Sequence, residues 1–218
     1  MKAALVGVIA SWADLQFALR MKQSPDLFEL RLDCLCPIGN DLEKKFSRLD
    51  APLIITARDP REGGMGNLSL QKRCDLLLRF LPRAKYVDVE FRSVRAFKPL
   101  LAQARKRNVR LILSFHDFKS TPTSRSLRAK AQRAKALGAD IFKVATRTDK
   151  PSDLARLVDF ITNNDARIDI SAMGIGRLGA ISRLLLARSG SVLNYAALQR
   201  TVVEGQLPID LLRSALGR

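Results

Sequence analysis

Eight apolar segments rich in β-branched residues recur along the chain, and this repetition restricts the fold more than any other feature. They begin near residues 4, 27, 52, 85, 110, 140, 167 and 191, so successive segments start 23 to 33 residues apart. Segments with helical spacing lie between them, for example LSLQKRCDLLLRFL and DLARLVDFITNN. One strand and one helix fill such an interval, and strands that alternate with helices form a parallel sheet.

Eight strand-and-helix units favour a closed (β/α)8 TIM barrel, although 218 residues is short for that fold. An open, doubly wound sheet is the alternative. It is disfavoured because the first strand is followed by SWADLQ and not by a glycine-rich phosphate-binding turn. No linker or low-complexity stretch interrupts the series, so we expect one domain over residues 1–218.

Composition narrows the class of protein further. The single histidine, His116, argues against a histidine-rich metal site, and the three cysteines have neither zinc-binding spacing nor a disulfide pattern. Such cysteines suit a reducing compartment, so we expect a cytoplasmic protein. The opening MKAALVGVIA resembles a secretion signal only weakly and is interpreted as the first strand. No other segment approaches the roughly 18 apolar residues of a membrane helix.

Polar residues recur at one parity along the predicted strands, mostly toward their carboxyl ends. Side chains alternate between the two faces of a strand, and a purely structural barrel interior is filled mainly by Val, Ile and Leu. The polar set is Glu29, Arg31, Asp33, Thr56, Arg58, Asp88, Glu90, Ser114, His116, Lys143 and Asn194. We interpret this set as a polar site, because buried ion pairs alone are a poor source of stability. For Asp33, Asp88 and Glu90, simple mutual pairing remains an equal alternative.

Lys143 lies at the centre of the predicted strand IFKVAT, where both faces of a barrel strand are covered. Burial disfavours the charged ammonium. A lysine that is partly neutral attacks carbonyl groups and forms an imine, or Schiff base. The alternative is a lysine that reaches out to solvent or pairs with a carboxylate such as Glu29.

His116 ends the strand before that of Lys143, so the two are expected to be neighbours in space. A histidine beside an imine-forming lysine is a candidate general acid and base. The loop REGGMG, residues 61–66, follows the third strand. Its glycines permit a sharp turn that brings Glu62 over the barrel mouth, although such a loop is often only a turn.

These residues give the sequence a resemblance to the type I 3-dehydroquinate dehydratases of the shikimate pathway. The matching stretches occur in order over almost the whole chain: ELRLD, ITARDPREGG, YVDVE, SFHDF, FKVAT, AMG with GAISR, NYA and EGQ. The resemblance implies a (β/α)8 barrel without metal or organic cofactor. It also implies dehydration of 3-dehydroquinate to 3-dehydroshikimate through a lysine imine, in aromatic amino acid biosynthesis, by a homodimer.

The resemblance implies a role for each matching residue. Lys143 corresponds to the imine lysine, His116 to the general acid and base, and Glu62 to the carboxylate that pairs with it. Arg183 corresponds to the arginine that clamps the substrate carboxylate, which its planar fork suits. Substrate contacts are implied for Glu29, Arg31, Arg58, Met173, Arg183, Tyr195 and Gln206, the last as part of a lid.

Four departures from the family pattern stand out. Met173 precedes Arg183 by ten residues, two more than usual, so core packing is an equal interpretation for Met173. Val202 occupies the position of a serine before the lid glutamine, which removes a hydroxyl contact. Tyr195 stands where phenylalanine is usual, and the barrel is expected to lack the N-terminal hairpin of many members.

The net charge of +17 is concentrated in residues 92–135, which carry 13 Lys and Arg against one acid, Asp117. Nucleic-acid binding would account for such a surface, but 6% aromatic content and the lack of a binding motif disfavour it. We interpret the segment as a solvated basic face, with steering of an anionic substrate as a hypothesis. The alternatives to a dehydratase are another Schiff-base barrel enzyme of the class I aldolase type and, less well supported, a basic nucleic-acid-binding protein.

Overall fold

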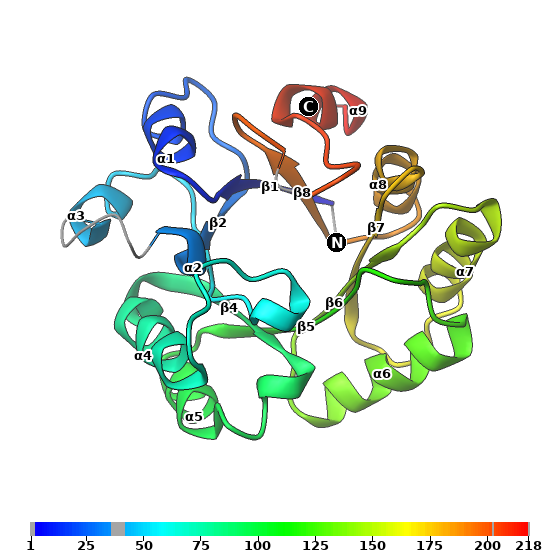
Figure 1. Cartoon of the computed structure of the whole chain (residues 1–218), viewed down its shortest axis with the longest axis horizontal. Helices are drawn as coiled ribbons and strands as arrows, with labels where there is room; N and C mark the ends of the chain where they lie inside the picture. The colour runs from blue at the N-terminus through cyan, green and yellow to red at the C-terminus, as the bar shows by residue number, and fades with distance from the viewer. Residues whose placement is uncertain (1–2, 36–41, 202, 218) are drawn as a thin grey trace.

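Eight parallel strands surrounded by helices form a barrel (Figure 1), in a computed structural model that describes residues 3–35, 42–201 and 203–217. The strands are β1 (Ala4–Ile9), β2 (Leu27–Arg31), β3 (Leu53–Thr56), β4 (Ala84–Glu90), β5 (Arg110–Asp117), β6 (Ile141–Arg147), β7 (Asp169–Ile175) and β8 (Leu193–Ala197). The larger helices are α1 (Trp12–Ala18), α4 (Leu70–Phe80), α5 (Lys98–Lys106), α6 (Ser124–Ala136), α7 (Pro151–Thr162), α8 (Gly179–Arg188) and α9 (Ile209–Ala215). The short ones are α2 (Leu32–Leu35), α3 (Leu42–Phe46), η2 (Pro60–Glu62), η3 (Leu81–Arg83) and η4 (Phe91–Ser93).

The strands follow one another around the barrel in sequence order, and β8 returns to pair with β1. At the seam between β7 and β8, serine side chains supplement a backbone hydrogen bond from Val192 N to the Ile170 carbonyl at 2.9 Å. Ala172 N donates to Ser191 Oγ at 3.1 Å, and Ser171 Oγ donates to the Leu193 carbonyl at 2.8 Å. The predicted barrel is therefore confirmed as a nearly closed one, in which two serines join the last strands.

The two strand faces separate as the alternation predicts. One face packs against the helices and is apolar, for example Leu30, Val87, Leu113 and Val144. The other faces the barrel interior, whose amino-terminal half is filled by Val6, Leu27, Ile54, Tyr86, Ile112 and Ile141. Toward the carboxyl ends this interior face becomes polar. An apolar plug thus closes one end of the barrel beneath a polar layer.

Two members of the predicted polar set, Asn194 and Asp33, do not lie on the interior face of the strands. Asn194 occupies the face of β8 opposite Tyr195, and its Nδ2 donates to the Ser191 carbonyl at 3.1 Å. The assignment of Asn194 to the interior face was therefore wrong, because no charged neighbour in that segment fixes which parity points inward. Asp33 lies beyond the end of β2, in α2, so it does not share the strand face of Glu29.

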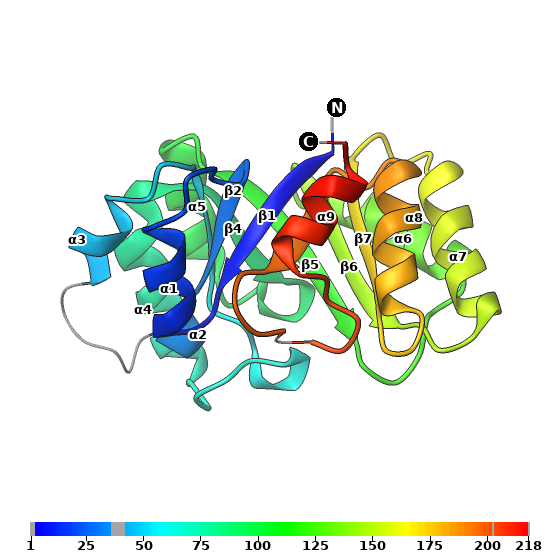
Figure 2. The same ribbon diagram turned by 90° about the horizontal axis from the view of Figure 1, so that it is seen from above.

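The two ends of the barrel carry different parts of the chain. Figure 2 shows the start of β1 and the end of α9 at one end and the connections after β3 and β8 at the other. Helices α5 and α6, which hold much of the basic segment, lie on the outside of the barrel (Figure 1) and contain no acidic residue. No helix in the described part of the chain is long and apolar enough to cross a membrane.

The serine seam makes a testable contribution to stability. Ser191→Ala would leave the buried N–H of Ala172 without its acceptor, so we expect the free energy of unfolding to fall by about 1–3 kcal/mol. Urea denaturation measures the change. Ser189→Ala is the matched control, because its Oγ donates only to the exposed Leu185 carbonyl, and it should cost less than about 0.5 kcal/mol. Equal effects of the two changes would contradict a special role for the seam.

Candidate active site

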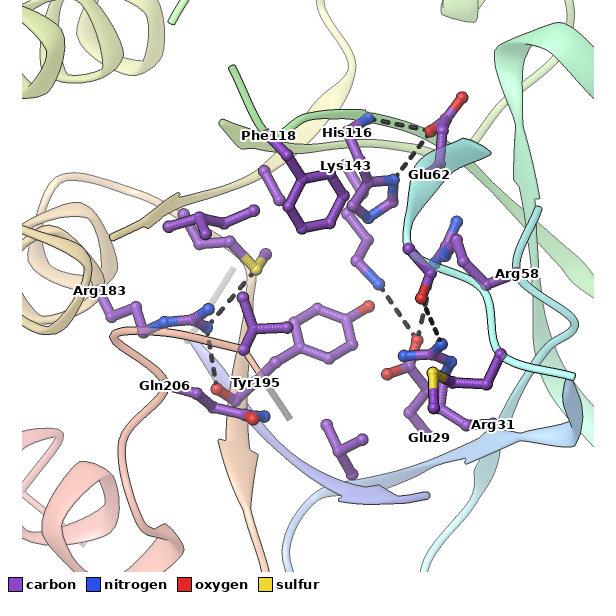
Figure 3. Close-up of a pocket in the computed structure, with 17 residues that line it drawn as sticks. Glu29, Arg31, Arg58, Glu62, His116, Phe118, Lys143, Arg183, Tyr195 and Gln206 are labelled. Carbon is purple, nitrogen blue, oxygen red and sulfur yellow. Dashed lines mark hydrogen bonds and ion pairs between the residues drawn. The ribbon is translucent and has the colours of Figure 1, made fainter. Parts of the chain in front are cut away.

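A cavity of about 210 Å³ lies at the carboxyl end of the barrel, where parallel barrels place their active sites. All ten residues that the sequence suggested for the site line this cavity. Figure 3 labels all of them except Met173. They come from β2, β5, β6, β7, β8 and α8 and from the connections after β3 and β8. The volume suits a small molecule better than a drug-sized one.

Lys143 projects from β6 into this cavity and is 4% exposed. Its Nζ lies 3.1 Å from Glu29 Oε1 and 3.0 Å from Asp88 Oδ2, and 3.9 Å from the centre of the Tyr195 ring. Pairing with carboxylates, the alternative considered above, therefore accounts for the buried lysine. The amine of Lys143 thus lies between two carboxylates and an aromatic face, and both favour positive charge at its nitrogen.

Asp88 is the centre of this ionic cluster. Arg58 donates to both of its oxygens at 2.9 Å, and Ser114 Oγ donates to Oδ1 at 2.6 Å. Burial alone would raise the pKa of Asp88, but Arg58 and Lys143 outweigh it and hold that pKa below its ordinary range. Asp88 thus stays ionised, and its contacts include the candidate nucleophile.

Arg31 and Asp33 attach the connection after β3 to the barrel rim. Arg31 binds Asp33 through two nitrogens, at 3.0 and 2.8 Å, and donates to the Gly63 carbonyl at 3.2 Å. Asp33 also accepts from the backbone N–H groups of Arg58 and Met65, at 3.2 and 3.0 Å. The connection that carries Glu62 is therefore held in place by a buried salt bridge.

The glycines of that connection give it its shape. Gly63 has φ +84°, a conformation that residues with a Cβ rarely adopt. A Cβ on Gly64 would lie only 2.1 Å from the carbonyl oxygen of Arg58. The sharp turn predicted for REGGMG is present, and it brings Glu62 to the cavity wall.

His116 and Glu62 form a hydrogen-bonded pair at the cavity. Glu62 Oε2 lies 3.0 Å from His116 Nδ1 and accepts from the His116 backbone N–H at 3.0 Å. Its other oxygen, Oε1, accepts from Arg92 Nε at 2.9 Å. When Glu62 is ionised it can only accept, so Nδ1 then carries the proton and Nε2 keeps the lone pair of a base.

Burial sets the protonation of both partners. It raises the pKa of Glu62 to about 7, with a further contribution from Glu90. It also lowers the pKa of His116 well below the usual 6.5, and the cations Arg58 and Lys143 act in the same direction. The imidazole is therefore neutral at pH 7 and can accept a proton.

Arg183, from α8, forms the opposite wall of the cavity. Its Nη1 donates to the Tyr195 carbonyl at 3.1 Å and lies 3.6 Å from Met173 Sδ. Its buried Nε has no partner among the described residues, and burial lowers the Arg183 pKa to about 10. A buried guanidinium with an unused donor is well suited to an anionic group.

The connection after β8 covers part of the cavity. Gln206 lines the cavity and is 8% exposed. Beside it, Glu204 pairs with Arg147 of β6 at 3.0 Å, and the Glu204 carbonyl accepts from Gly176 N at 3.2 Å. Val202 was expected to remove a hydroxyl contact, because it stands where the family has a serine. This residue lies outside the described residues.

Some contacts and some residues of the site could not be predicted from the sequence. Asp88 was in the polar set, but alternation could not show that it touches Lys143. Phe118 and Met65 line the cavity from connections that have no periodic pattern. Arg92 follows β4, and no motif signals that it reaches Glu62.

A parallel barrel with a buried lysine and a histidine–carboxylate pair in its carboxyl-end cavity defines a (β/α)8-barrel enzyme. The type I 3-dehydroquinase profile matches residues 11–217. Two 3-dehydroquinate dehydratases, from Shouchella clausii and Pyrococcus abyssi, are each 34% identical, over 89% and 88% of this chain and 81% and 87% of theirs.

Solved structures agree with the sequence comparison. A type I 3-dehydroquinate dehydratase from Clostridium difficile, solved with covalent modified comenic acid, superimposes with a TM-score of 0.90 at 25% identity. The alignment covers 99% of this chain and 92% of that one. The chain belongs to the type I 3-dehydroquinase family.

The contact between Arg92 and Glu62 predicts a change in titration. Removal of a cation disfavours the carboxylate, so Arg92→Gln should raise the Glu62 pKa above its value of about 7. The chain has one histidine, so the imidazole NMR signals of a histidine-labelled sample all come from His116, and they report the charge on Glu62. We expect its step near pH 7 to move upward by roughly half a pH unit or more.

Arg95→Gln is the matched control for this measurement, because it removes the same charge from an exposed residue of the same connection. Its titration step should remain at the wild-type position. Identical titration curves for both variants would show that Arg92 has no specific effect on Glu62.

Proposed function

We propose that the protein dehydrates 3-dehydroquinate to 3-dehydroshikimate through an imine on Lys143, in the shikimate pathway. One observation carries the proposal: the buried amine of Lys143 shares a cavity with the chain's single histidine, already paired to a carboxylate. Family membership supplies the substrate. The covalent modified comenic acid in the Clostridium difficile structure is consistent with a nucleophile in such a site.

The first step is imine formation. Lys143 Nζ loses a proton, attacks the C3 carbonyl carbon of the substrate and then loses a second proton. The carbonyl oxygen takes up these two protons and leaves as water, and a protonated C=N bond joins the substrate to the lysine. Glu29 and Asp88, both near 3 Å from the amine in the free enzyme, keep a positive charge at this nitrogen favourable. The protonated imine is therefore stabilised where it forms.

The second step is proton transfer at the neighbouring carbon. The protonated imine withdraws electrons, so the C2 proton becomes acidic, and His116 Nε2 accepts it to give an enamine. Glu62 bonds to Nδ1 and stabilises the resulting imidazolium. The enamine expels the C1 hydroxyl, which takes the proton from His116 and leaves as water. Hydrolysis of the remaining imine releases product and restores Lys143.

Arg183 orients the substrate for these steps. The substrate carboxylate is an anion, and Arg183 lines the cavity with an Nε donor that has no partner among the described residues. A carboxylate there would fix the ring relative to Lys143 and His116 on the other side of the cavity. Met173 and Gln206 would enclose the ring from neighbouring walls.

Family membership favours this reaction over the aldolase alternative, and the basic helices α5 and α6 do not require a nucleic-acid partner. Steering of the anionic substrate by these helices stays a prediction. We also propose a cytoplasmic homodimer, from the resemblance and from the cysteine content.

Turnover of 3-dehydroquinate tests the proposed function. The product contains a carbon–carbon double bond conjugated with its ketone, so ultraviolet absorbance follows its formation. We expect His116→Ala to reduce kcat by about 10²–10⁴-fold. Lys143→Ala should abolish turnover, because no other described amine lines the cavity.

Lys143→Arg separates chemistry from folding. Arginine keeps a cation near Glu29 and Asp88 but stays protonated and cannot form the imine. This variant should be folded by circular dichroism and inactive. Wild-type turnover in Lys143→Ala or Lys143→Arg would overturn the proposed mechanism.

A further inference from the structure

The hydroxyl of Tyr195 is a buried polar group without a hydrogen-bond partner among the described residues. Tyr195 is 4% exposed, and its ring lies against Lys143 Nζ at 3.9 Å. Figure 3 shows the hydroxyl end of the ring directed toward Lys143 and Glu29, within the cavity. Leaving such a group unpaired costs stability, so its presence requires a reason.

The other tyrosine of the chain, Tyr86, has a hydroxyl that is hydrogen-bonded, as buried polar groups usually are. Tyr86 also faces the barrel interior, but its hydroxyl accepts from Arg110 Nη1 at 2.9 Å. Tyr86 lies in the apolar half, away from the cavity, whereas Tyr195 is one of the residues that line it. Of the two tyrosine hydroxyls, only that of Tyr195 is directed at a position where substrate would bind.

The surroundings of Tyr195 keep its hydroxyl in the donor form. Burial raises the pKa of Tyr195 well above 10, and the nearby charges of Glu29 and Asp88 raise it further. The group therefore carries its proton throughout the physiological range. A neutral hydroxyl next to the attacking amine can donate a hydrogen bond to an oxygen on the attacked carbon.

We propose that the Tyr195 hydroxyl donates a hydrogen bond to the substrate oxygen on the carbon that Lys143 attacks; this rests on the proposed function. As the nitrogen–carbon bond forms, the carbonyl π electrons move to that oxygen, which then takes up the two protons that the Lys143 nitrogen gives up and departs as water. Tyr195 keeps its own proton and stabilises the developing negative charge. It is a catalytic residue in addition to Lys143 and His116.

Two variants test this assignment, and they should behave in opposite ways. Tyr195→Phe removes an unpaired buried hydroxyl, so its thermal unfolding midpoint should rise, while kcat/KM falls about 10- to 100-fold. Tyr86→Phe is the matched control, because it removes a hydroxyl that is already bonded to Arg110. Its unfolding midpoint should not rise, and its kcat/KM should equal that of the wild-type chain.

The possible results are distinguishable. Equal kcat/KM for Tyr195→Phe and wild type overturns the role of the hydroxyl but leaves the proposed function intact. Lower activity together with a lower unfolding midpoint also overturns it, because that pair of effects indicates a structural role. A wild-type chain that fails to convert 3-dehydroquinate overturns the proposed function itself, and the role of Tyr195 with it.

Discussion

The buried carboxylate of Asp88 is the interaction on which the rest of the site depends. It accepts hydrogen bonds from Arg58, Ser114 and Lys143 inside a barrel that excludes solvent from all of them. Removing one partner from such a cluster leaves an uncompensated buried charge, which typically costs about 3–5 kcal/mol. Asp88 therefore offsets the energetic cost of burying two cationic side chains, one of which carries the amine proposed to form the imine.

The polar layer is possible because the barrel divides its interior by depth. Apolar side chains fill the amino-terminal half, and charged ones gather where the strands end. The connection after β3 adds Glu62 from above, held by the salt bridge between Arg31 and Asp33. A rigid set of carboxylates thus surrounds the amine and the imidazole before substrate arrives, which is the preorganisation that electrostatic catalysis requires.

The surroundings of Lys143 differ from the simplest expectation for an imine-forming lysine, which is an apolar pocket. Glu29 and Asp88 lie 3.1 and 3.0 Å from its nitrogen and favour positive charge there. The same two acids would then favour the protonated imine, which carries its positive charge on the same nitrogen. The site is therefore better matched to the cationic intermediate than to a neutral amine, consistent with complementarity to states along the reaction path.

Much of the fold follows from periodicity, because strand spacing and alternation are local properties of the sequence. The repeat of eight segments predicted the barrel, and parity placed Glu29 and Lys143 on its inner face. Parity failed for Asn194, since the segment SVLNYAA has no charge that decides which face is buried. Distances between strands are not local, so the direct contact of Asp88 with Lys143 and the reach of Arg92 to Glu62 needed the three-dimensional structure. The roles of Arg183 and Gln206 came from family resemblance, because neither lies in a strand pattern.

Chemical trapping of the covalent intermediate is the most direct test of the central claim that Lys143 captures a carbonyl group. The wild-type chain is mixed with 3-dehydroquinate, reduced with borohydride, digested and mapped by mass spectrometry. A reduced adduct should appear on the peptide that contains Lys143 and should require both substrate and reductant. Substrate turnover without any adduct on Lys143, or with the adduct on another lysine, would contradict the imine mechanism.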